Sequence, residues 1–276
     1  MLESLTALLQ VALYAGLLSA SGSVFARATL LPRHDDAEYL AQIMRRSAAL
    51  MLIASPLSAG VLVLRLGGEL DEPTLSAVFL SSSGAALALH VTGALLLLTA
   101  SSDDSVVMLL SYAILPLLGF AFSGHAAGIG PVEGAVAVAH VSMAAWWLAS
   151  LFYLRRGCEQ WQFDRLVSAV TRFSSLAFIL TGVLVIGGLV LILILVDFSK
   201  DPWLTPYGWI LGAKLCVVAV LLTLAGYNRR RLTPRLLQGD ASAVQALRAT
   251  IGAELLLIAA VLTITSILTT YTSPHD

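Results

Sequence analysis

The sequence predicts an all-α integral membrane protein, a bundle of about eight transmembrane helices. Three observations carry this prediction. Hydrophobic residues make up 58% of the 276 residues, and only 12% are charged, whereas about a quarter of a soluble domain is charged. The mean hydropathy is +0.87. The apolar residues also gather in long runs, and a backbone in lipid must satisfy its own hydrogen bonds, so runs of this kind must be helices.

Eight stretches have the roughly 20 mostly apolar residues that a membrane-spanning helix needs. The first lacks a preceding basic region, and it is longer than the apolar core of a signal peptide, so we expect a retained helix. The connectors are too short for a separate soluble domain, and residues 1–276 are expected to form a single polytopic membrane domain. The eight stretches are 5–27, 42–64, 75–99, 104–122, 133–154, 173–196, 206–227 and 247–270.

The basic residues alternate between connectors and thereby predict the orientation. Of the 16 lysines and arginines, 13 lie in or beside the connectors after the first, fifth and seventh stretches. The connectors after the second and sixth stretches are acidic or near neutral. Arginine-rich connectors face the cytoplasm, so an even number of spans leaves both termini on the non-cytoplasmic side. A net charge of −1 gives no indication of a nucleic-acid partner.

Two histidines are candidates for a site at the outer side of the bilayer. His125 lies between glycines in the connector before the stretch 133–154, and His140 lies inside that stretch. Met143 shares a helix face with His140. Imidazole and thioether together suit copper, as Cu(I) or Cu(II), better than magnesium or calcium. The alternative is that His140 makes a buried polar contact, Met143 packs, and His125 is solvated.

A third histidine, His90, falls near the middle of the stretch 75–99. It is a candidate third metal ligand, a haem ligand, or a histidine hydrogen-bonded to a neighbouring helix. Haem needs two axial ligands on facing helices. Only His90 and His140 lie within spans, at depths that differ by about 9 Å, so a haem protein is the weaker interpretation.

Two ionisable residues lie well inside the hydrocarbon, Lys214 on the seventh stretch and Glu254 on the eighth. A lone charge there costs several kcal/mol, so each needs a partner or must be neutral. Their depths differ by about 7 Å, which a long lysine stem can bridge. We therefore expect an intramembrane charged pair, with a role in proton or cation movement as the alternative.

Several short motifs, taken in order, resemble the bacterial copper resistance protein D (CopD) family. The resemblance covers roughly residues 115–272. One departure is that this family commonly has a glycine pair after the tryptophan, where this chain continues as Leu148-Ala149-Ser150. The motifs are Gly124-His125-Ala126, His140 with Trp146-Trp147, Arg172-Phe173-Ser174, Gly212-Ala213-Lys214-Leu215, Tyr227-Asn228-Arg229-Arg230, and Leu247-Arg248 with Glu254.

The resemblance implies a multi-pass protein of the bacterial inner membrane that transports copper, not an enzyme. Copper would enter from the periplasm at His125 and His140, with Met143 or His90, and move to the cytoplasm. A separate periplasmic copper carrier is an implied partner. Two alternatives remain open here: a b-type cytochrome-like electron carrier, and a membrane partner that supplies copper to a periplasmic protein.

Overall fold

The computed structural model describes residues 2–65, 71–101, 104–122, 130–196 and 202–272, and every regular element in these ranges is a helix. Seven helices are long and apolar enough to cross a membrane, which confirms the all-α membrane fold. The elements are α1 (Leu2–Leu30), α2 (His34–Arg65), α3 (Glu72–Phe79), α4 (Ser82–Thr99), α5 (Val106–Leu118), the 3₁₀ turn η1 (Gly119–Phe122), α6 (Pro131–Gln160), α7 (Phe163–Leu195), the 3₁₀ turn η3 (Pro202–Leu204), α8 (Pro206–Tyr227), the π-helical turn η4 (Asn228–Leu232), α9 (Thr233–Leu237) and α10 (Ser242–Tyr271).

The structure differs from the expected spans in two places. The expected stretch 75–99 is two helices, because the Ser81 hydroxyl accepts a hydrogen bond from the Gly84 amide at 3.3 Å and starts α4 as a new helix. The stretch 104–122 forms a shorter apolar helix, Val106–Phe122, in which Pro116 precedes the 3₁₀ turn. The fourth of the eight expected spans is therefore present as a helix below spanning length.

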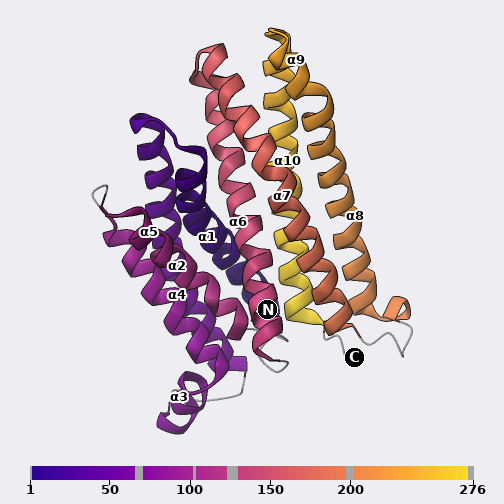
Figure 1. The fold of residues 1–276 in the computed structure, drawn as a ribbon. Coiled ribbons are helices and arrows are strands. Elements are labelled where there is room, and N and C mark those ends of the chain that lie inside the picture. Colours follow the sequence, from indigo (N-terminus) through magenta and orange to yellow (C-terminus); the bar gives the residue numbers. More distant parts are fainter. Residues whose placement is uncertain (1, 66–70, 102–103, 123–129, 197–201, 273–276) are drawn as a thin grey trace.

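The bundle has two sides joined by α1 (Figure 1). One buried cluster is built from α1, α2, α4 and α5, and includes Leu17, Met51 and Leu97. Another is built from the end of α1 with α2 and α6 to α10, and includes Trp146 and Ile251. Because α1 contributes to both, it holds the two sides together.

The two ends of the chain lie at the same end of the bundle (Figure 1). Near the start of α1, the Gln10 side-chain oxygen accepts hydrogen bonds from Thr269 and Thr270 of α10, each at 2.9 Å. The Ser266 hydroxyl donates to the Ala7 carbonyl at 2.6 Å. These hydrogen bonds join the start of α1 to the end of α10.

Helices α1 and α6 approach each other closely at Gly22. A Cβ atom on Gly22 would lie 2.0 Å from the Ala145 carbonyl oxygen and 3.1 Å from the Ala149 Cβ. Only a residue without a side chain fits between these two backbones.

The turn between α9 and α10 is closed by Asp240, whose carboxylate accepts hydrogen bonds from the Ser242 hydroxyl and the Arg235 guanidinium at 2.6 and 2.9 Å. These bonds favour the charged form, so they lower the pKa of this exposed carboxyl, with Ser242 contributing most. The turn holds α10 antiparallel to α8, which positions Glu254 beside the end of α8.

Candidate functional site

His140 is held by a hydrogen bond between two neighbouring helices. Its Nδ1 lies 2.8 Å from the Leu184 carbonyl oxygen of α7. A carbonyl can only accept, so Nδ1 carries the proton and donates. In a neutral imidazole this leaves the lone pair on Nε2, the arrangement found in metal-binding histidines, whose other ring nitrogen donates to a carbonyl or carboxylate.

Two glycines of α7 make room for the His140 ring. A Cβ atom on Gly188 would lie 3.0 Å from His140 Cε1, and one on Gly187 would lie 3.4 Å from His140 Cβ. A side chain at residue 188 would therefore require the ring to shift by a few tenths of an ångström. His140 is the tenth residue of α6, roughly 14 Å along the axis from Pro131.

The other predicted metal ligands, Met143 and His125, differ in what the structure describes of them. Met143 lies one turn further along α6 and is half-buried. His125 lies outside the described residues. Within the part of the chain that the structure describes, no group of three or more histidine, cysteine, aspartate or glutamate side chains is arranged to hold a metal ion. A site at His140 therefore needs a sulfur ligand such as Met143, or ligands from elsewhere.

His90 is placed apart from His140. It is buried in α4, with its ring edge-on to Phe120, and Nε2 would lie 2.3 Å from a Cβ on Gly119. The ring thus fills the space of the absent Gly119 side chain, and its buried Nε2 has no hydrogen-bond partner among the residues that the structure describes. Because His90 packs against η1 while His140 packs against α7, the structure does not provide the facing pair of imidazoles that haem requires.

The expected pair between Lys214 and Glu254 is not formed. Among the described residues, no ion pair within 4.0 Å includes Lys214. Glu254 is 2% exposed, and its carboxylate accepts hydrogen bonds from Trp147 Nε1 at 3.2 Å and Asn228 Nδ2 at 2.6 Å. Neutral donors therefore replace the lysine, a partnership that the depth estimate could not reveal.

Two of the motifs quoted above for the resemblance supply the hydrogen-bond donors of this carboxylate, Trp147 and Asn228, and their neighbours contact a third, Arg172-Phe173-Ser174. Trp146, next to Trp147, stacks on Phe173 with 5.4 Å between ring centroids. Arg229, next to Asn228, donates to the Ser174 carbonyl. The sequence motifs of α6, α7, η4 and α10 are thus one packed unit rather than separate features.

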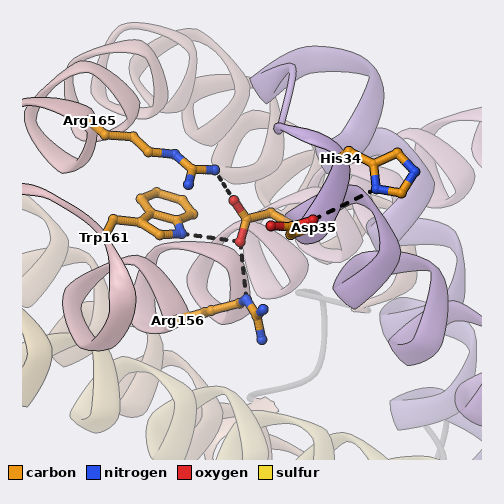
Figure 2. A network of polar contacts seen from close by, with 6 residues as sticks. His34, Asp35, Arg156, Trp161 and Arg165 are labelled. Atoms are coloured by element: carbon orange, nitrogen blue, oxygen red, sulfur yellow. Dashed lines mark hydrogen bonds and ion pairs between the residues drawn. The ribbon is translucent and has the colours of Figure 1, made fainter.

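A second polar network was missed by the sequence analysis. Asp36, in the first turn of α2, is 2% exposed and accepts hydrogen bonds from Arg156 Nε at 3.0 Å, from Trp161 Nε1 at 3.1 Å and from Arg165. Figure 2 shows the three donors around this carboxylate. Arg156 also lies over the Tyr39 ring, 4.6 Å from its centroid. The network ties α2 to the α6–α7 connector at the arginine-rich end of the bundle.

The fold and the buried polar groups define a polytopic α-helical membrane protein with ionisable side chains inside its bundle. Residues 167–268 match the family model of copper resistance protein D (CopD), which confirms the resemblance over α7 to α10 and relates the chain to copper-resistance membrane proteins. Lys214, Asn228 and Glu254 lie within the matched residues, whereas His90, His125, His140 and Met143 precede them. No curated protein and no solved structure matches the chain.

Proposed function

We propose that this protein transports copper across the bacterial inner membrane, from the periplasm to the cytoplasm. The family match supports copper as the substrate. The single observation that carries the site is the bond from His140 Nδ1 to the Leu184 carbonyl, because it fixes the ring and leaves Nε2 as a ligand. Met143 would add a thioether, and His125 a second imidazole.

The direction of transport is inferred from the charges. The arginine-rich connectors predict which end of the bundle is cytoplasmic, and α6 begins at the opposite end with Pro131. His140 and Leu184 both lie in the part of their helices nearer that opposite end. Copper would therefore be received from the periplasm, and a soluble periplasmic copper carrier is the proposed donor.

The first test replaces His140 by alanine. We expect copper binding by the purified protein to fall by about 10-fold or more, since even the loss of a residue that only orients a ligand costs 10–100-fold. Copper accumulation in sealed vesicles should fall with it. His34→Ala is the matched control, because His34 is almost fully exposed. Copper uptake that His140→Ala leaves unchanged would falsify the site.

A second test changes the environment of His140 without removing it. In Gly188→Ala the new Cβ would lie 3.0 Å from His140 Cε1, so the ring must shift by a few tenths of an ångström, and copper affinity is expected to fall several-fold. Gly182→Ala on the same helix is the control, since a Cβ at that position meets nothing within 4 Å. Copper titration of both purified variants decides the point; equal affinities would show that the orientation of the ring is irrelevant.

A further inference from the structure

Glu254 is a buried carboxylate without a cationic partner in the part of the chain that the structure describes. Both of its described hydrogen-bond donors, Trp147 and Asn228, are neutral. An isolated charge in such surroundings is costly, and a buried carboxyl group without a cationic partner favours its neutral, protonated form. The group is therefore suited to holding a proton.

Arginines on the helices around Glu254 are engaged elsewhere. Arg155 of α6 and Arg248 of α10 both pair with Glu159, at 3.8 and 2.9 Å. Arg229 of η4 donates to the Ser174 carbonyl of α7. Lys214 of α8 lies within 4.0 Å of no carboxylate among the described residues. None of the described basic groups lies within 4.0 Å of Glu254, so none compensates its charge.

Asn228 carries a second sign of an incomplete network. Its Nδ2 donates to Glu254, whereas its Oδ1 is buried and accepts no hydrogen bond from any described residue. A buried acceptor without a donor costs about 1–3 kcal/mol. An amide presents either its NH₂ or its oxygen to a neighbour after a half-turn about its last bond. A protonated Glu254 would supply the O–H donor that Asn228 Oδ1 lacks.

We propose that Glu254 and Asn228 form a proton-binding site inside the bundle. In the charged state, Asn228 Nδ2 donates to the carboxylate. When a proton binds to a carboxylate oxygen, the amide turns and its Oδ1 accepts a hydrogen bond from the new O–H group. One proton enters and leaves, no covalent bond other than O–H changes, and no electron is transferred.

Asn228 lies at a point where a change in its side chain can affect the backbone conformation. Asn228 is the first residue of the π-helical turn η4, and its carbonyl accepts the hydroxyl of Thr233 at 3.1 Å. Short π-helical segments inside α-helices occur frequently at functional sites. Protonation thus alters a side chain at the junction of α8 and α9. A further step, in which this proton is exchanged during copper movement, rests on the proposed function.

The test measures the carboxyl group directly, in copper-free protein reconstituted in lipid vesicles. Infrared difference spectra recorded between acid and alkaline pH should contain a band from a protonated buried carboxyl group. The band should be absent in Glu254→Gln. In Asn228→Leu it should persist at a higher frequency, because the hydrogen-bond acceptor is gone. Glu159→Gln, which changes a partly exposed carboxylate paired with arginines, should leave the band unchanged.

The outcomes separate this proposal from copper transport. A band that survives in Glu254→Gln, or a wild-type spectrum without a titrating carboxyl band, overturns the proton site. A band whose frequency is the same in Asn228→Leu overturns the role of Asn228, and this variant keeps the test valid if Glu254→Gln fails to fold. Because the spectra are recorded without copper, they test the proton site alone. A protein that does not transport copper can still show the carboxyl band, and a copper transporter can lack it.

Discussion

Asp36→Ala is expected to destabilise the protein by about 3 kcal/mol, the largest effect that we expect from removing one polar side chain. Breaking a buried ion pair by removing one partner costs about 3–5 kcal/mol, because the remaining charge is left uncompensated. Here two arginines and the Trp161 N–H lose their acceptor together. We place the expected loss at the lower end because Arg156 and Arg165 keep about a quarter of their side-chain surface exposed.

The neighbouring residue provides the control for this prediction. Asp35 is 92% exposed and lies 3.7 Å from an exposed His34, and such surface pairs contribute at most about 1 kcal/mol. Thermal unfolding in detergent should therefore show a large decrease in Tm for Asp36→Ala and almost none for Asp35→Ala. Similar melting temperatures for the two variants would mean that the Asp36 network does not hold α2 to the α6–α7 connector.

Gly22→Ala is expected to disrupt the packing of α1 on α6. The new Cβ would lie 2.0 Å from the Ala145 carbonyl oxygen, a contact that side-chain rotation cannot relieve because the obstacle is backbone. Overpacking of a core costs about 1–3 kcal/mol and sometimes more, and here two helices must separate, so we expect about 3 kcal/mol or more. Size-exclusion chromatography and thermal unfolding should show loss of the compact, monodisperse protein.

A glycine-to-alanine substitution at Gly60 should not destabilise the protein. A Cβ on Gly60 of α2 meets nothing within 4 Å, and alanine is favoured over glycine in a helix by about 1 kcal/mol. Gly60→Ala is thus expected to be neutral or slightly stabilising. A Gly22→Ala variant as stable as Gly60→Ala would contradict the close approach of α1 and α6.

The fold class could be predicted because hydropathy and the membrane act on whole segments. A run of about 20 apolar residues has few alternatives to a helix in lipid. The break between α3 and α4 was missed because Leu80-Ser81-Ser82-Ser83 interrupts the run only briefly, and the Ser81 cap leaves little trace in a window average. The shortness of α5 depends on Pro116 and η1, which composition alone does not weigh.

The site was less predictable, because hydropathy shows which segments cross but not which faces meet. Their similar depth in the membrane made Lys214 and Glu254 plausible partners. The rotation of α8 and α10 about their axes instead places the Glu254 carboxylate against Trp147 and Asn228. The role of Asp36 could have been predicted from the sequence. The arginine-rich connectors after the first and fifth stretches were assigned to the same side of the membrane, and Asp36 in the first of them is an acceptor that the arginines of the other can reach.

The hydrogen bonds between Gln10 of α1 and the end of α10 constrain the order in which the protein can assemble during its synthesis. Its side-chain oxygen is bonded to a hydroxyl 259 residues later. Until that hydroxyl has been synthesised and has entered the bilayer, the amide must find water, lipid headgroups or a chaperone. The packing of α1 can therefore be completed only after α10 has inserted. In a nascent chain that stalls before α10, the Gln10 amide would stay unpaired in the membrane, where quality control could recognise it.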